Sequence, residues 1–326
     1  MITTGVPQGS ILGPLLFIIY INDIAAASTI FSSIIYADDT ALCSTLNVFK
    51  FDSHMNRNIN SELSKISDWL RANKLSLNVS KTKLIVFHKP QKRFESPQLQ
   101  INGTDIERVK DFNYLGILMN EHLSWKNHVT LIANKISRSI GILNKLKRFL
   151  PQVTLCLLYS SLVLSHLNYG ILAWGYQTER LFKLQKKAVR LISLGKFNSH
   201  TDPFFKKLHL LKIKDIHKLQ ELKFYYKLKN NQLPSYFYTM SSNASSNIHP
   251  YPTRHKHKLL LPKANHEFSK KCVRYSVIHT ALESPNYITD KIKTHSLHGF
   301  STYLKKQIID QYEITCNINN CYVCQV

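Results

Sequence analysis

The sequence predicts an α+β protein, in which a mixed N-terminal part is followed by a strongly basic helical part. Residues 1–120 combine apolar runs of strand length, stretches of helical spacing and intervening turn residues. From Ser124 onward the apolar spacing becomes three to four residues, which is typical of helices. Charge follows the same division: residues 1–80 carry 5 Lys and Arg against 6 Asp and Glu, and residues 81–326 carry 38 against 14.

The net charge of +23 and the isoelectric point near 9.7 indicate a polyanion as partner. A generically lysine-rich surface is the alternative. The hydrophobic fraction of 44% is enough for a buried core and argues against disorder.

The apolar stretch 11–24 is broken by turn residues and is too short to span a bilayer. No signal peptide is evident, so we expect an intracellular protein, nuclear or cytoplasmic, that is not secreted and has no membrane partner.

The most informative stretch is residues 36–39, with the sequence YADD. Apolar runs at 30–35 and 41–43 flank it, which predicts a β-hairpin with Asp38 and Asp39 at its tip. Adjacent carboxylates repel each other and are costly to desolvate unless their charge is offset. A bound Mg²⁺ or Mn²⁺ would offset the charge through hard oxygen ligands, whereas a solvated turn needs no ion. The residues alone leave both interpretations open.

Local patterns predict the other elements. Residues 15–21 are apolar on every side, which predicts a buried helix, and residues 51–73 show the spacing of an amphipathic helix. Asn102 and Gly103 form a typical hairpin turn. Short strands are expected at 75–79, 84–87 and 112–119. We expect four parts in all: a mixed part at 1–120, a helical part at 121–233, a linker or irregular loop at 234–265, and a small C-terminal region at 266–326.

The six cysteines do not form a disulfide framework in a chain of this length. Cys43, Cys156 and Cys272 lie singly in apolar surroundings and are expected to be reduced core residues. Cys316, Cys321 and Cys324 form a compact group near the C-terminus. This group is either part of a zinc knuckle, with a histidine as fourth ligand, or three unliganded thiols.

Four sequence blocks together resemble a known family. They are GVPQGSILGPLLF at 5–17, YADD at 36–39, NVSKTK at 78–83 and FNYLGI at 112–117. In this order and spacing they resemble the reverse transcriptases of non-LTR retrotransposons, and the jockey-like elements in particular. The resemblance implies an RNA-directed DNA polymerase of a transposable element. Its implied fold is the C-terminal half of a right-hand polymerase palm, an antiparallel sheet with helices, followed by a basic thumb-like helical region.

The resemblance also implies a chemistry, which is two-metal nucleotidyl transfer with Mg²⁺ or Mn²⁺. Asp38 and Asp39 are the implied catalytic metal ligands. Lys81 is matched to a lysine near the triphosphate, where an ordinary surface lysine is the alternative. Substrate-binding roles are implied for Gln8, Gly9, Tyr36 and Ala37, and a primer-grip role for Tyr114, Leu115 and Gly116. The implied partners are an RNA template, a DNA primer, their RNA–DNA hybrid and deoxynucleoside triphosphates.

The resemblance is incomplete in one respect. Reverse transcriptases of this kind use a third aspartate on an earlier strand and basic residues in the fingers, and neither precedes residue 5 here. We therefore expect an N-terminally truncated palm with little or no polymerase activity by itself. The alternatives are a non-catalytic module that binds RNA or RNA–DNA hybrid, and a remnant of the element without function.

Overall fold

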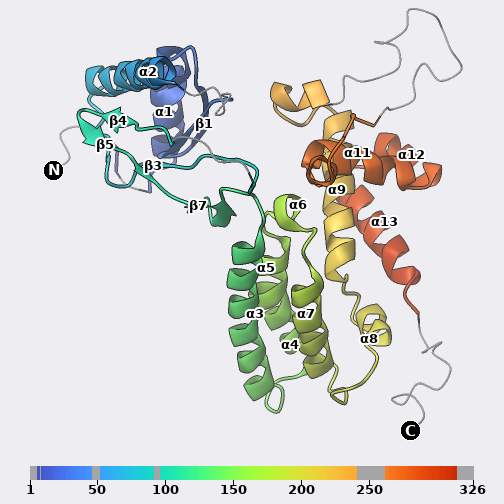
Figure 1. Cartoon of the computed structure of the whole chain (residues 1–326). Coiled ribbons are helices and arrows are strands. Elements are labelled where there is room, and N and C mark those ends of the chain that lie inside the picture. Colours follow the sequence, from blue (N-terminus) through green and yellow to red (C-terminus); the bar gives the residue numbers. More distant parts are fainter. Residues whose placement is uncertain (1–5, 8, 46–51, 92–95, 241–260, 314–326) are drawn as a thin grey trace, which may run out of the picture. The chain divides into compact units, whose positions relative to one another are not determined.

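A computed structural model describes residues 6–7, 9–45, 52–91, 96–240 and 261–313 of the chain (Figure 1). The chain divides into two compact units, Met1–Ser124 and Trp125–Val326, named unit 1 and unit 2 here. Each unit has its own buried apolar core. The finer division into four parts stays a prediction.

Unit 1 mixes helices with small two-stranded sheets, in agreement with the predicted α+β class. Three of the sheets are antiparallel hairpins, formed by β1 with β2, β4 with β5, and β7 with β8, while β3 and β6 pair in parallel. The helical elements are α1 (Leu12–Ile21), the 3-10 helix η1 (Asn22–Ala27) and α2 (Ser53–Ala72). The strands are β1 (Ser32–Tyr36), β2 (Asp39–Cys43), β3 (Lys83–Leu84), β4 (Gln100–Ile101), β5 (Thr104–Asp105), β6 (Glu107–Arg108), β7 (Asp111–Tyr114) and β8 (Ile117–Asn120).

Helix α2 is the element on which the core of unit 1 is built. The carboxylate of Asp52 caps its N-terminus by accepting a backbone N–H at 2.7 Å. Ile59, Leu63 and Ile66 are buried at helical spacing, which confirms the predicted amphipathic helix. The first two pack against residues 99–101, and Ile66 packs against α1 and η1. One helix face thus holds together elements from both halves of unit 1.

The prediction of a buried helix at 15–21 is wrong. Helix α1 forms, but only Ile21 is buried in it. Its exposed apolar side chains are Leu12, Leu15, Leu16, Ile18, Ile19 and Tyr20. The reason is geometric, because the described part of unit 1 covers only the side of α1 that carries Phe17 and Ile21. The Tyr20 hydroxyl ties this helix to the end of α2 by donating to the carbonyl of Asn73.

The turns of unit 1 only partly follow the sequence pattern. The predicted turn at Asn102 and Gly103 is confirmed, and both residues have positive φ, at 52° and 73°. The predicted strand at 112–119 is wrong as a single strand. It bends into the β7–β8 hairpin at Leu115 and Gly116, which have φ values of 47° and 78°. Residues 75–79 form no strand.

Unit 2 is helical throughout its described residues. A π-helical turn, η3, interrupts the run from α4 to α5. The elements are α3 (Lys126–Leu146), α4 (Gln152–Tyr159), η3 (Ser160–Leu164), α5 (Ser165–Asn168), α6 (Ile171–Trp174), α7 (Glu179–Ile192), α8 (Asp202–Lys207), α9 (Ile213–Lys229), the 3-10 helix η4 (Ser235–Met240), α10 (Glu267–Lys270), α11 (Val273–Glu283), α12 (Asn286–Thr294) and α13 (Leu297–Asp310). None of the described helices in either unit is long and apolar enough to cross a membrane.

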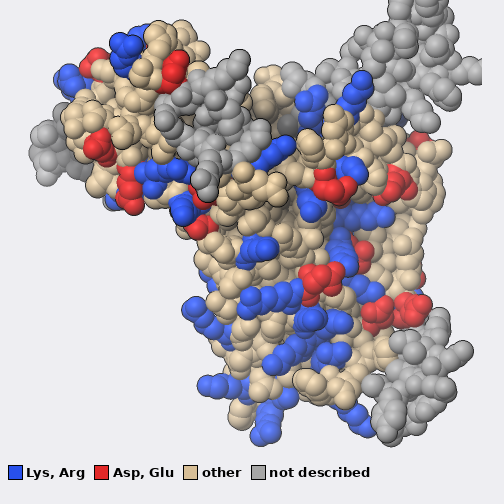
Figure 2. Space-filling view, viewed as in Figure 1, with Lys and Arg blue, Asp and Glu red and all other residues tan. Residues whose placement is uncertain are grey.

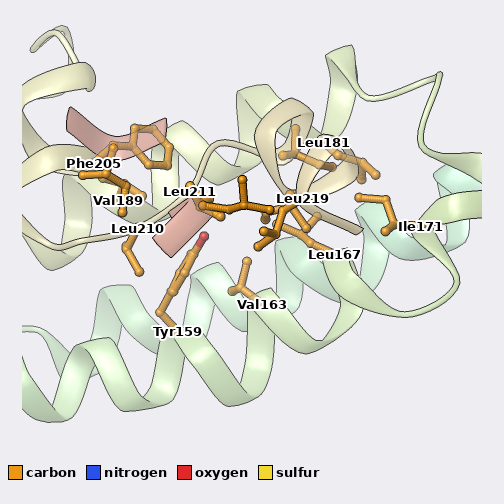
Figure 3. Close-up of a cluster of buried hydrophobic side chains, with 14 of the residues drawn as sticks. Tyr159, Val163, Leu167, Ile171, Leu181, Val189, Phe205, Leu210, Leu211 and Leu219 are labelled. Carbon is orange, nitrogen blue, oxygen red and sulfur yellow. The ribbon is translucent and has the colours of Figure 1, made fainter. Parts of the chain in front are cut away.

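One continuous core fills unit 2. Helix α3 packs beside α7, and α9 packs against α6, α11 and α13, so the C-terminal helices share the core of the preceding ones (Figure 1). Side chains from α4, α7, α8 and α9 converge in its centre (Figure 3). Trp174 is fully buried, and its indole N–H donates to the carbonyl of Tyr169 at 2.9 Å.

A buried amide links three elements within this core. Gln185 on α7 donates to the hydroxyl of Tyr159 and to the carbonyl of Leu211, both at 2.9 Å. Its carbonyl oxygen accepts the backbone N–H of Ile213, the first residue of α9, also at 2.9 Å. A buried polar side chain is stabilising only when its hydrogen bonds are made, and three bonds satisfy Gln185.

The prediction that the isolated cysteines are core residues is wrong in two of three cases. Cys43 and Cys272 are exposed and Cys156 is half-buried, and all three are free thiols. Cys43 faces outward because it lies on the β2 face away from α2, and Cys272 because it precedes α11 at its N-terminal end. Cys316, Cys321 and Cys324 lie outside the described residues, so their proposed zinc site stays a prediction.

We expect Leu143→Ala to lower the free energy of unfolding by about 2–5 kcal/mol, because it removes a fully buried side chain from the core of unit 2. The adjacent Ile142 is 46% exposed, so Ile142→Ala is a matched control with a change within about 0.5 kcal/mol. Urea unfolding followed by circular dichroism measures both. Equal losses for the two variants would contradict the packing described for α3.

Candidate active site

The two adjacent aspartates lie where the sequence predicts, at the turn of the β1–β2 hairpin. The strands pair from Ser32 with Cys43 to Tyr36 with Asp39, which leaves Ala37 and Asp38 as the two connecting residues. Both carboxylates are exposed, as is the phenol ring of Tyr36. The turn therefore presents two hard oxygen ligands side by side to the solvent.

The turn has a backbone feature that the sequence pattern does not reveal. Ala37 has a φ of 51°, in the left-handed region that residues other than glycine adopt at a cost of order 1 kcal/mol. Such strained positions persist where the surrounding structure fixes them, and they are frequent at functional sites. Here the strand pairing on both sides of Ala37 fixes it.

Packing against α2 holds the hairpin from behind. Phe31, Ile35 and Leu42 pack against the buried side chains of α2 and α1, whereas Ile34 and Tyr36 point outward. This alternation is that of a strand pair with one buried face. The side of the hairpin that packs against α1 and α2 is thus apolar, and the acidic turn extends beyond these contacts.

A buried carboxylate anchors the entry to β1. Glu62 of α2 accepts hydrogen bonds from the Ser28 hydroxyl at 2.6 Å and the Thr29 backbone N–H at 2.9 Å, and it pairs with Lys65 at 2.5 Å. The hydrogen bonds from Lys65, Ser28 and Thr29 lower the pKa of Glu62 to about 2. A charged residue such as Glu62 on an amphipathic helix is ordinarily expected on the exposed face. Its position three residues after Ile59, beside Leu63, is the signal that it lies on the buried face.

The structure brings the expected primer-grip hairpin close to the acidic turn. Burial, and then the negative charge of the Asp39 carboxylate, raise the pKa of Tyr114 above its ordinary value. The Tyr114 hydroxyl is buried without a hydrogen-bond partner in the described part of the chain. A protonated phenol near the Asp39 carboxylate is a donor for an oxygen at this site. Leu115 and Gly116 lie at the turn of the same hairpin.

The structure describes three of the remaining residues near the expected site, Gly9, Lys81 and Lys83. Gly9 has a φ of 87°, and the space where a Cβ would lie is open. Glycine is therefore favoured at this position by its backbone conformation, and not because a side chain would clash. Gln8 lies outside the described residues. Lys81 is exposed, and its ammonium makes no described contact, whereas Lys83 is paired with Glu107 at 2.6 Å. Lys81 is therefore the more available cation of the two.

The aspartate pair fits a divalent cation in donor type, although it supplies only part of a site. Carboxylate oxygens are the ligands that Mg²⁺ and Mn²⁺ prefer. Among the described residues, however, neither Asp38 nor Asp39 belongs to a cluster of three or more metal-binding side chains. The arrangement can thus provide two neighbouring oxygen ligands, and further ligands must come from elsewhere.

Unit 2 presents a basic surface over two neighbouring helices, named the α3–α7 basic surface here (Figure 2). Its residues are Lys135, Arg138, Lys145, Arg180, Lys183 and Lys187, all exposed. Arg180 of α7 donates to the Thr130 hydroxyl of α3 at 3.2 Å, which joins the two helices across the surface. A hollow of about 500 Å³ runs along α3 from Asn127 to Arg138. Such a surface attracts a polyanion.

Comparisons with known proteins agree with these features. Residues 1–119 match the family described as reverse transcriptase (RNA-dependent DNA polymerase). The chain is 27% identical over 204 residues to the probable RNA-directed DNA polymerase from transposon X-element of Drosophila melanogaster, which covers 59% of this chain and 22% of that protein. It is 26% identical over 210 residues to the RNA-directed DNA polymerase from mobile element jockey of Drosophila funebris, again covering 59% of this chain and 22% of that protein.

A more distant relative belongs to another element. The Pol polyprotein from the type-1 retrotransposable element R1 of Bradysia coprophila is 24% identical over 178 residues, which cover 53% of this chain and 17% of that protein. The chain spans about a fifth of the length of these curated relatives. No solved structure matches it significantly.

These findings confirm the family inferred from the sequence motifs. The match of residues 1–119 to the reverse transcriptase family, together with the similarity to the X-element and jockey polymerases, supports a jockey-like reverse transcriptase of the non-LTR type.

The anchor at Glu62 leads to a prediction about acid stability. The pKa of Glu62 is lowered from 4.5 to about 2 in the folded chain, so its stabilising contribution is complete above pH 4.5 and is lost as the pH falls toward 2. We expect Glu62→Gln to lower the free energy of unfolding at about pH 7 and to lower it less at about pH 3. Urea unfolding at both pH values measures this.

Glu107→Gln serves as the control, because Glu107 is an exposed glutamate of β6 that pairs with Lys83 and makes none of the hydrogen bonds at the β1 entry. A Glu62→Gln deficit that stays the same at both pH values would contradict an ionised, hydrogen-bonded anchor.

Proposed function

We propose that the chain is the part of a non-LTR retrotransposon RNA-directed DNA polymerase that carries the Asp-Asp metal ligands. One observation carries this proposal: Asp38 and Asp39 are exposed together at a β-hairpin turn, inside the segment that matches the reverse transcriptase family. Reverse transcriptases use divalent metal ions, nucleic-acid template and primer, and deoxynucleoside triphosphates. In this proposal unit 1 is part of the palm, and the first helices of unit 2 form a thumb-like region. The chain then acts inside the cell, in the nucleus or the cytoplasm.

The proposed reaction is two-metal nucleotidyl transfer. The metal ions, Mg²⁺ or Mn²⁺, lower the pKa of the primer 3′-hydroxyl and stabilise the charge on the leaving pyrophosphate. Asp38 is the direct ligand and Asp39 its neighbouring ligand. Tyr36, Ala37 and the β7–β8 hairpin lie at the primer end, and the Tyr114 phenol donates to an oxygen near Asp39.

Two further groups have proposed roles around the nucleotide. Gln8 and Gly9 lie against the templating base and the incoming nucleotide. Lys81 neutralises the triphosphate, which is supported by its exposed ammonium without a described partner.

We further propose that this chain alone polymerises poorly. The support is structural, since among the described residues no third metal-binding side chain joins Asp38 and Asp39. With an incomplete ligand set, the metal ions bind weakly and the 3′-hydroxyl is not positioned for attack.

A second candidate function is binding without catalysis. The α3–α7 basic surface favours it, because this surface belongs to unit 2 and needs no metal site to bind RNA or an RNA–DNA hybrid through its phosphates.

A chimera tests the catalytic proposal. Residues 1–119 replace the corresponding segment of the X-element polymerase, and primer extension on an RNA template is measured with Mg²⁺ or Mn²⁺. We expect extension that Asp38→Asn reduces by roughly 10²-fold or more, since a lost metal ligand costs several kcal/mol of transition-state stabilisation.

Asp23→Asn is the matched control, because Asp23 is an exposed aspartate outside the hairpin, and it should leave extension unchanged. A folded chimera that extends equally well with and without the Asp38→Asn substitution would exclude a catalytic role for the acidic turn.

Salt dependence tests the binding proposal on the full chain. We expect Lys135→Glu combined with Arg138→Glu to weaken RNA binding. The logarithm of the binding constant should also fall less steeply with the logarithm of the salt concentration, by about one unit of slope for each lost phosphate contact. Lys305→Glu combined with Lys306→Glu makes the same charge change on exposed residues of α13. Equal effects of the two pairs would show that net charge, rather than the α3–α7 basic surface, governs binding.

A further inference from the structure

A cluster of three metal-binding side chains lies in unit 1, at the end of the β7–β8 hairpin opposite the turn that carries Leu115 and Gly116. His88 follows the β3 segment, and Glu121 and His122 follow β8. The Nε2 atom of His88 lies 3.4 Å from Oε2 of Glu121, and Nε2 of His122 lies 3.9 Å from Oε1. One ligand atom from each of the three residues lies within 4.8 Å of the other two. Within the described residues this is the one such group of three or more.

The other ring nitrogens of both histidines face carbonyl oxygens. Nδ1 of His88 lies 3.0 Å from the carbonyl oxygen of Lys89, and Nδ1 of His122 lies 3.0 Å from that of His88. A carbonyl oxygen only accepts, so each Nδ1 carries the proton and donates it. In the neutral rings each Nε2 then presents a lone pair toward Glu121. This arrangement, with Nδ1–H held by a backbone carbonyl, is the usual second shell of a metal-binding histidine.

Three electron-rich groups directed at one point are stabilised by a positive charge between them, which is either a proton on one imidazole or a bound cation. Arg108 adds positive charge on one side, with its guanidinium 2.9 Å from Oε2 of Glu121. On the side facing the two imidazoles, Glu121 forms no ion pair with an arginine or lysine of the described chain. A cation placed among the three ligand atoms would be bound by both imidazoles and the carboxylate at once.

The spacing suits zinc. With Zn–N and Zn–O distances of about 2.0–2.1 Å, the ligand atoms of a tetrahedral site lie about 3.4 Å apart. His88 already lies 3.4 Å from one Glu121 oxygen and His122 lies 3.9 Å from the other, and the three ligand atoms lie within 4.8 Å of one another, so zinc binding needs the three side chains to close together slightly. Two neutral imidazoles and one carboxylate are also a known three-ligand set for Zn²⁺, with water as the fourth ligand. The hard Mg²⁺ ion, by contrast, prefers oxygen ligands such as those of Asp38 and Asp39.

The backbone holds these ligands in place. The His88 N–H donates to the Glu121 carbonyl at 3.0 Å, and the Glu121 N–H donates to the Lys110 carbonyl at 2.8 Å. The side chains of His88 and Glu121 are 9% and 10% exposed, and that of His122 is 27% exposed. The cluster is therefore mostly buried, and His122 leaves a path to solvent.

We propose that His88, Glu121 and His122 bind one Zn²⁺ ion. Arg108 and the carbonyls of His88 and Lys89 orient the three ligands. The ion joins two segments that are 34 residues apart in the sequence and fixes the end of the β7–β8 hairpin to the segment after β3. The site is separate from the proposed polymerase function and does not depend on it.

The test is Zn²⁺ binding to the full chain in which Cys316, Cys321 and Cys324 are replaced by serine, so that the C-terminal thiols do not contribute. A chromophoric chelator competes for Zn²⁺, and the metal content is measured after gel filtration. We expect one Zn²⁺ per chain, and an affinity at least about tenfold lower in His88→Gln and in His122→Gln. His54→Gln is the control, because His54 is exposed on α2, and it should bind as the parent does.

Equal Zn²⁺ affinity in all of these chains, or no bound Zn²⁺ in the parent, would overturn the proposal and leave a metal-free ion pair between Glu121 and the histidines. A second measurement needs no substitution at the site. In the cysteine-replaced chain, Zn²⁺ should protect His88 and His122, but not His54, from diethyl pyrocarbonate, as mapped by mass spectrometry. Equal modification of the three with and without Zn²⁺ would likewise overturn the proposal, even if the glutamine variants fail to fold.

Discussion

The structure of unit 1 depends on the burial of one face of α2. Ile59, Leu63 and Ile66 give this helix an apolar face that two hairpins and two helical elements share. Two neighbouring carboxylates repel each other and add nothing to folding, so the turn that carries Asp38 and Asp39 has to be stabilised from elsewhere. The stabilisation comes from Ile35 and Leu42 on the inner face of the hairpin, and from the hydrogen bonds that Glu62 makes to its entry.

Sequence patterns correctly predicted those elements whose conformation is determined by residues close together in the sequence. The amphipathic spacing of α2 and the hairpin turn at Asn102 and Gly103 both follow from local chemistry. The acidic turn was also evident, because the flanking apolar runs and the paired aspartates point to the same element. The roles of the site residues were inferred from the family resemblance, because local sequence rules do not assign catalytic roles.

The predictions were wrong where contacts between residues far apart in the sequence determine the structure. Whether α1 is buried depends on which elements pack over it, and composition carries no such information. Glu62 looks like a surface residue until the loop at Ser28 and Thr29 folds onto it. His88 and Glu121 are far apart in the sequence, and only the pairing of their backbones brings the two side chains together. The bend at Leu115 placed a leucine in a conformation that pattern rules assign to glycine or asparagine.

The exposed face of α1 has a practical consequence for any work with the purified chain. Six large apolar side chains on one short helix form a surface of the kind that drives self-association in water. If copies of the chain associate through this face, measured nucleic-acid affinities will depend on protein concentration, because an assembly presents several α3–α7 basic surfaces to one strand and gains avidity. Titrations at several protein concentrations, with the oligomeric state recorded at each, separate the intrinsic affinity of one chain from that of an assembly.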